Sequence, residues 1–206
     1  MAIEIELKAH AGDHRALRVL LEQKTEYQSA FIKEDTYWFS GGIQPNGTTP
    51  DQKTGLPPAG LRVRKEKRSF PDGREEFFTF VTYKIKEVRD GIEINDEKEF
   101  EIRPISSKDT EHSSAMFEEL LIRLGLKPGI SKRKRGWSFT HKEINAELTE
   151  VDGLGWFVEL ELLADNNLAE TVSMGQKKLL NLLAELGIKR EAVESRFYSE
   201  MLRAKT

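Results

Sequence analysis

Cysteine is absent from this sequence of 206 residues, which excludes a disulfide framework, zinc–thiolate ligation and a thiol nucleophile. Histidine is scarce as well, and its four scattered residues do not favour a histidine-rich zinc site. No apolar run approaches membrane-spanning length. The formal net charge of −3 gives no global attraction to nucleic acid or to an anionic membrane, so any site for a polyanion must be local.

The composition is that of a soluble globular protein, with 38% hydrophobic and 33% charged residues. The length suits one domain over residues 1–206, which can bury a substantial core without a structural metal. A patterned strand begins directly after Met1, and no basic leader or apolar signal core precedes it. We therefore expect a cytoplasmic protein with no membrane partner.

Two periodicities divide the chain into strands and helices. Period-two alternation or strand-forming composition predicts strands at 2–10, 27–39, 61–67, 77–86, 92–103, 130–139, 142–151 and 156–163. Helical spacing predicts a helix from about Asp13, one from Ser106 or Ser107 to about Leu124, one over 168–186, and a short one at 193–202. Glycine, proline, asparagine and threonine make 41–60 a long loop. The prediction is an α+β fold with strands within about 1–163 and C-terminal helices at about 166–202.

Charged residues gather on one face of these strands, opposite apolar residues. The positions that share this face are Glu4, Glu6, Lys8, Arg62, Arg64, Thr82, Lys84, Glu99, Glu101, Lys132, Lys134, Glu159 and Glu161. The face is either the solvated side of an ordinary sheet or the lining of a closed, hydrated barrel. Clusters of both signs recur on several strands, and this segregation favours the barrel.

Each kind of charge in this pattern suggests a ligand. A Glu-x-Glu pair places two carboxylates side by side on one face of a strand, and hard oxygen ligands of this kind suit Mg²⁺ or Mn²⁺. Arginine and lysine at alternating positions bind phosphate oxygens through guanidinium forks and ammonium charges. Either signal alone is weak.

The opening pattern Glu4-Ile5-Glu6-Leu7-Lys8 resembles the N-terminal signature of the CYTH superfamily, the triphosphate tunnel metalloenzymes, which includes class IV adenylate cyclases and thiamine triphosphatases. Later segments agree with this resemblance, namely 35–37, 61–64, 82–84, 97–101, 132–134 and 151–161. The resemblance implies an eight-stranded antiparallel β-barrel or tunnel with flanking α-helices, often as a homodimer. Residues 151–161 and the tail 196–202 resemble the cyclase branch most.

The resemblance also assigns roles to the charged face. The implied metal ligands, for Mg²⁺ or Mn²⁺, are Glu4, Glu6, Glu159 and Glu161, with Glu99, Glu101 and Glu147 as further candidates. The implied triphosphate-binding residues are Lys8, Arg62, Arg64, Lys84, Lys132 and Lys134, of which Lys8, Arg62 and Arg64 are the candidate catalytic residues. Register alone leaves open whether Arg133 and Arg135 replace Lys132 and Lys134 on this face.

The chain departs from the family pattern at three positions, one of which is Lys134, where many relatives carry arginine. Thr149 stands where relatives usually carry aspartate, and Glu97 stands where many carry arginine. Glu147 lies on the same face as Thr149 and is either a substitute ligand or an ordinary charged residue of the strand.

Three functions are compatible with this pattern. The leading hypothesis is a class IV-type adenylate cyclase that converts ATP to cyclic AMP and pyrophosphate. The second is a triphosphatase for inorganic triphosphate, thiamine triphosphate or nucleoside triphosphates. The third is a module that binds polyphosphate or an RNA end without turnover. The expected partners are a small triphosphate-containing molecule and a second copy of the chain, and the charge balance does not favour nucleic acid.

Overall fold

Strands dominate the computed structural model, which describes residues 3–40, 59–103 and 110–205. The strands are β1 (Ile3–His10), β2 (Glu26–Ser40), β3 (Ala59–Ser69), β4 (Glu75–Arg89), β5 (Ile92–Glu101), β6 (Leu126–His141), β7 (Ile144–Val151) and β8 (Gly155–Ala164). The helices are α1 (His14–Lys24), α2 (Thr110–Arg123), α3 (Ala169–Glu185), the 3-10 turn η1 (Arg190–Ala192) and α4 (Tyr198–Arg203). None of the helices in the described ranges is long and apolar enough to cross a bilayer.

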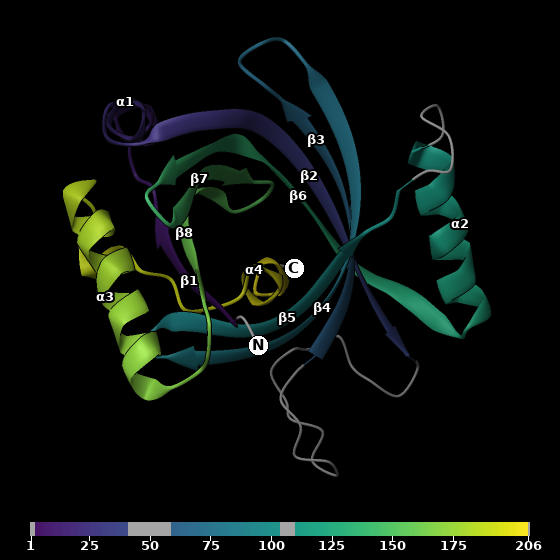
Figure 1. The fold of residues 1–206 in the computed structure, drawn as a ribbon. Coiled ribbons are helices and arrows are strands. Elements are labelled where there is room, and N and C mark those ends of the chain that lie inside the picture. The colour runs from purple at the N-terminus through teal and green to yellow at the C-terminus, as the bar shows by residue number, and fades with distance from the viewer. Residues whose placement is uncertain (1–2, 41–58, 104–109, 206) are drawn as a thin grey trace.

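The strands form one closed antiparallel barrel in the order β1-β5-β4-β3-β2-β6-β7-β8 (Figure 1). Strand β1 closes it by pairing with β5 on one side and with β8 on the other. Closure gives every strand two neighbours, so the barrel has an inner and an outer face but no free sheet edge. The predicted eight-stranded antiparallel barrel with flanking helices is confirmed.

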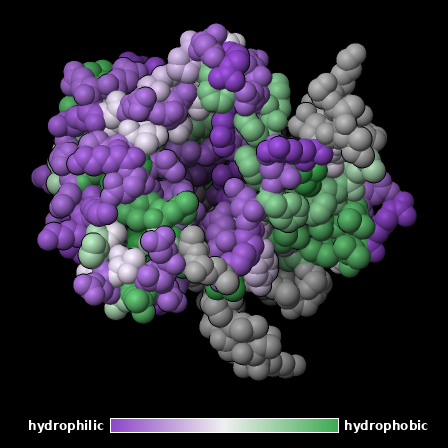
Figure 2. All heavy atoms as spheres, in the orientation of Figure 1, coloured by the Kyte–Doolittle hydropathy of each residue, from purple (hydrophilic) through white to green (hydrophobic). Residues whose placement is uncertain are grey.

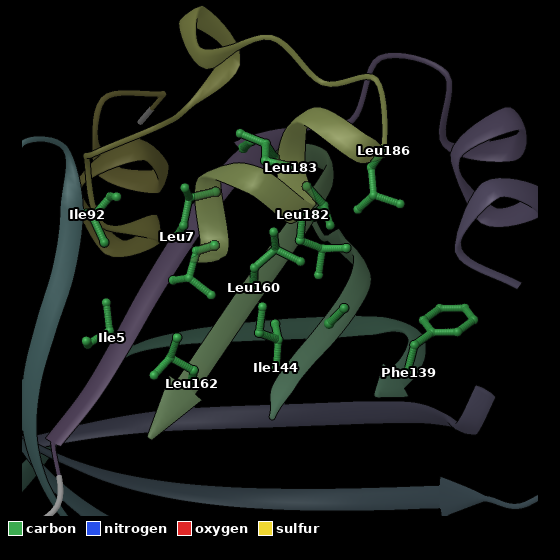
Figure 3. Packing of buried hydrophobic residues seen from close by; sticks show 14 of the residues in the cluster. Ile5, Leu7, Ile92, Phe139, Ile144, Leu160, Leu162, Leu182, Leu183 and Leu186 are labelled. Atoms are coloured by element: carbon green, nitrogen blue, oxygen red, sulfur yellow. The ribbon is translucent and has the colours of Figure 1, made fainter. Parts of the chain in front are cut away.

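The apolar half of each strand explains where the helices lie. In β1, Ile3, Ile5 and Leu7 are buried on the outer face together with the apolar residues of β7, β8, α1 and α3 (Figure 3). Helix α3 comes so close that a Cβ on Gly175 would lie 2.5 Å from the Ile5 Cδ1 atom. The core therefore lies between the barrel wall and the helices, and the inside of the barrel is left to other side chains.

A second, smaller core lies under α2. Trp38, Val63 and Val81 from the outer faces of β2, β3 and β4 pack with Leu121 of this helix. Helix α2 ends before Gly125, which has a positive φ of 84°, as the sequence predicts. The predicted capping residues Ser106 and Ser107 lie outside the described residues, as does most of the predicted loop over 41–60.

Several strands are longer than the sequence predicts. The β3–β4 hairpin pairs from Ala59↔Ile85 to Ser69↔Glu75, and β6 runs over 126–141 instead of 130–139. Few of the additional residues are large and apolar, so they carry no apolar alternation, although their backbones still pair across the sheet. The last helix was also predicted too early, because Val193 forms a bridge with Ala9 and α4 begins only at Tyr198.

Candidate functional site

The barrel interior is lined by charged side chains, here called the tunnel residues. Alternation along each strand points Lys132 and Lys134 inward, while Arg133 and Arg135 point outward and pair with Glu34 and Glu150. This decides the register that the sequence left open. Figure 2 shows a recess lined with hydrophilic residues at the centre of this face of the molecule.

A buried carboxylate, Asp35 on β2, organises one group of cations. Arg64 donates to both of its oxygens, from Nε at 2.6 Å and from Nη2 at 3.0 Å, while Lys132 Nζ lies at 3.3 Å and Arg62 Nη1 at 4.0 Å. Burial acts to raise the pKa of Asp35, but the charges of Arg64, Lys132 and Arg62 outweigh it and hold this pKa well below its ordinary value. Asp35 therefore stays ionised and holds these cations in place.

Carboxylates crowd the wall formed by β5, β1 and β8. Glu6 lies directly opposite Glu93 on one side and opposite Glu161 on the other. Like charges directly across a sheet destabilise it. Burial and the charges of Glu4 and Glu6 raise the pKa of Glu161 to about 8. Burial, together with Glu6 and Glu97, also raises the pKa of Glu4 to about 7, although Lys84 opposes the shift. This wall holds more negative charge than its neighbours neutralise.

Lys84 of β4 is shared by several carboxylates of this wall. Its ammonium group contacts Glu4, lies 3.4 Å from a Glu6 oxygen and lies 3.0 Å from a Glu97 oxygen. Burial acts to lower the pKa of Lys84, but the three carboxylates outweigh it and raise this pKa well above its ordinary value. Glu97 thus faces the tunnel and shares Lys84 with Glu4.

The donors on this wall suit a hard divalent cation. Within the described ranges, no three acidic or histidine side chains already converge as a metal cage. Glu4, Glu6 and Glu161 are nevertheless neighbouring carboxylates whose mutual repulsion a divalent cation would offset. Asn95 adds a neutral ligand, because its side chain is fully buried, its Nδ2 donates to Glu4 at 2.9 Å, and its Oδ1 has no hydrogen-bond partner. The residues present therefore fit Mg²⁺ or Mn²⁺.

Glu159 lies in a different group from Glu4. It accepts two hydrogen bonds from Lys134 Nζ, at 2.8 and 2.6 Å, and a third from Tyr198 Oη at 2.9 Å. Burial acts to raise the pKa of Glu159, but Lys134 outweighs it and lowers this pKa. Lys8 is the cation of the opening motif, and its Nζ atom lies 3.3 Å from a Glu93 carboxylate oxygen.

The remaining candidates are scattered along the tunnel. Glu147 accepts from Lys33 at 2.5 Å and lies opposite Glu159. Glu99 binds Thr82 and Arg62, whereas Glu101 pairs with Arg103 far along β5 from the carboxylate wall. The structure does not bring these last two to Glu4 and Glu6.

Thr149 is fully buried between Gly136 and Phe157, and its hydroxyl has no hydrogen-bond partner. It lies on the inner face, two residues from Glu147, so the departure from the family pattern falls inside the tunnel.

Sequence reasoning gave no site role to several tunnel residues, although Asp35 and Glu97 stood in motif segments; these residues are Lys33, Asp35, Glu66, Glu93, Asn95, Glu97 and Tyr198. Alternation offered a signal for most of them, because Lys33 and Asp35 share one face of β2, and Glu93, Asn95 and Glu97 share the face of Glu99. Tyr198 lies in the tail, where no strand pattern exists, and gave no such signal.

Comparison with known proteins finds the CYTH family, which the opening pattern of the sequence resembles. The profile of the CYTH domain matches residues 2–198. A Methanocaldococcus jannaschii protein named "Putative adenylate cyclase MJ0240" is 27% identical over 97% of this chain and 98% of its own length. The solved structure of PH1819 from Pyrococcus horikoshii has a TM-score of 0.73 and 27% identity, and the match covers 98% of this chain and 99% of that one. A Hippeastrum protein, described as a putative adenylyl cyclase with a dominant triphosphatase activity, shares the fold at 15% identity, with a TM-score of 0.64 and coverage of 100% and 97%.

Proposed function

The chain belongs to the CYTH domain family, and from this premise we propose that it binds the triphosphate group of a small molecule in its tunnel and cleaves it with a divalent metal. The observation that carries the proposal is the division of the tunnel lining. Cations of β3 and β6 surround Asp35 of β2, and the carboxylates of Glu4, Glu6 and Glu161 crowd one another on β1 and β8. A triphosphate with its metal ion has the complementary charges.

We propose adenylate cyclisation as the reaction. In this reaction the ribose 3′ oxygen forms a bond to the α-phosphorus, the bond from that phosphorus to the bridging oxygen breaks, the 3′ hydroxyl loses its proton, and pyrophosphate leaves. The relative from Methanocaldococcus jannaschii supports this choice, because it matches almost the whole chain and its name is that of a cyclase.

The chain's own residues have three roles in this reaction. Arg62 and Arg64 are held at Asp35 and present rigid guanidinium groups that grip and orient the phosphate oxygens. Lys8, Lys132 and Lys134 neutralise the charge that develops on the leaving pyrophosphate. Glu4, Glu6 and Glu161 with Asn95 would hold the divalent cation, which would supply positive charge for the phosphate oxygens and for the developing 3′ alkoxide.

The test mixes purified protein with ATP, and separately with inorganic triphosphate, each with Mg²⁺ or Mn²⁺. Phosphorus NMR and nucleotide chromatography identify the products. Cyclic AMP with pyrophosphate supports cyclisation, and orthophosphate indicates the triphosphatase reaction instead. Binding without turnover indicates a sensor. If the protein shows no binding and no turnover, the proposal is overturned.

A matched pair of variants ties the activity to the tunnel. Lys134→Ala removes an inward cation that pairs with Glu159, and Arg133→Ala removes the neighbouring outward cation on the same strand. We expect the first variant to lose turnover by about 100-fold, as is usual when one charge-stabilising donor is removed, and the second to keep it. Equal losses in both variants would place the chemistry outside the tunnel.

A further inference from the structure

The C-terminal tail returns to the barrel and fills one end of the tunnel. The Glu194 amide donates to the Lys8 carbonyl at 2.8 Å, next to the bridge between Val193 and Ala9. Beyond it, α4 lies within the ring of strands when the barrel is viewed as in Figure 1. Tyr198 and Met201 of this helix form a buried cluster with Val151, Leu154 and Phe157.

One side chain of this tail, Tyr198, reaches the tunnel cations. The Nζ atoms of Lys8, Lys132 and Lys134 lie 4.8, 5.2 and 4.9 Å from the centre of its ring. Its hydroxyl donates to Glu159, the carboxylate that also binds Lys134. Only 6% of the residue is exposed, so water does not screen these contacts.

This arrangement counters two costs of gathering lysines. Three ammonium groups near one point repel each other, and each long side chain loses rotamer freedom when it is fixed. The electron-rich face of an aromatic ring attracts cations, more strongly when they are desolvated. One ring contacted by three lysines therefore holds them together before any anion binds.

We propose that Tyr198 is a positioning residue of the triphosphate site, which keeps Lys8, Lys132 and Lys134 together at the end of the tunnel that the tail fills. The inference rests on the proposed function, because it concerns the cations assigned there to phosphate. It makes the tail part of the site. A phosphate group bound by these lysines then stabilises the docked position of α4, since binding and docking share the same side chains.

The experiment compares the affinity for inorganic triphosphate with Mg²⁺ by calorimetry. Tyr198→Leu removes the ring, and Tyr198→Phe keeps the ring but removes the hydroxyl. The matched controls are Tyr83→Leu and Tyr83→Phe, because Tyr83 lies on the outer face of β4 and is 47% exposed. We expect about tenfold weaker binding for Tyr198→Leu, near-normal binding for Tyr198→Phe and no change for the controls.

The outcomes separate this inference from the proposed function. If the wild type does not bind triphosphate, the proposed function fails and the inference fails with it. If Tyr198→Leu melts at a lower temperature but binds as tightly as the wild type, Tyr198 only packs the tail and the inference alone is overturned.

A second measurement uses the wild type only, so it does not depend on whether a variant folds. Amide hydrogen exchange over residues 193–205 should slow when Mg²⁺ and triphosphate are added. Unchanged exchange at saturating triphosphate would contradict the linkage between the tail and the site.

Discussion

Glu161→Gln should stabilise the metal-free protein at high pH. In the folded chain this carboxyl has a pKa of about 8 instead of 4.5, because it is buried and faces Glu4 and Glu6. A raised pKa in the folded state means that the folded chain binds the proton more tightly than the unfolded chain. Stability therefore falls as the pH rises from about 5 through 8, and glutamine, which cannot ionise, removes this loss.

The magnitude follows from the shift. One pKa unit corresponds to about 1.4 kcal/mol, so the full shift sets a ceiling of roughly 5 kcal/mol above pH 9. Part of the shift of the Glu161 pKa comes from the charges of Glu4 and Glu6, which can themselves take up protons, and hydration of the tunnel lowers the cost of ionisation. We therefore expect a net gain of about 2 kcal/mol at pH 9, which is about 4 to 8 °C in Tm for a chain of this length.

Thermal and urea unfolding in EDTA, from pH 5 to pH 9, measures the effect. The two proteins should have similar stability at pH 5 and diverge as the pH rises, and added Mg²⁺ should stabilise the wild type more than Glu161→Gln. Glu34→Gln is the control, because Glu34 lies on the outer face of β2 with 59% of its side chain exposed. A gain that does not depend on pH, or a loss at pH 9, would refute the account of the carboxylate wall.

Three further predictions concern other residues. Asp35→Asn removes the carboxylate that Arg64 and Lys132 share and should lower the free energy of unfolding by about 3 kcal/mol or more in urea, with partial recovery when triphosphate is added. Glu4→Ala should reduce metal-dependent turnover by about 100-fold. Its circular dichroism spectrum and Tm should stay close to those of the wild type, so a parallel loss of structure would contradict a role confined to the site. Gly136→Ala should unfold the barrel locally, because the new Cβ would lie 2.0 Å from the Leu148 carbonyl oxygen; a soluble variant with normal Tm would show that β6 and β7 can separate there.

The sequence was a good guide to the barrel because strand alternation is a local property. The side chains of β1 fall on two faces by period two alone, and the structure buries Ile5 and Leu7 outside and turns Glu4 and Glu6 inward. In β6, period two alone did not decide whether Lys134 or Arg135 points inward. The structure shows that Lys134 does.

Period-two alternation could not predict which side chains contact one another across the tunnel. Period two states which face a residue occupies, but the side chains that meet across the lumen depend on how the strands are staggered around the barrel. Asp35 was visible as part of a motif, yet nothing in the sequence showed that Arg64 and Lys132 converge on it. The contact of Tyr198 was the hardest to predict, because this residue lies in the C-terminal helix α4 and its hydroxyl donates to Glu159 of β8.

The position of β1 in the barrel has a consequence for how the protein folds. Ile3 pairs with Ala164, so the strand that carries Glu4, Glu6 and Lys8 completes both of its ladders only when segments from far along the chain are in place. Contacts of such long sequence separation slow folding, because the entropy of closing the loop is lost before the contacts form. During synthesis, β1 must wait for β8 to leave the ribosome. The carboxylate wall therefore forms late, and the chain brings its most strongly repelling side chains together only after most of the barrel is available to hold them.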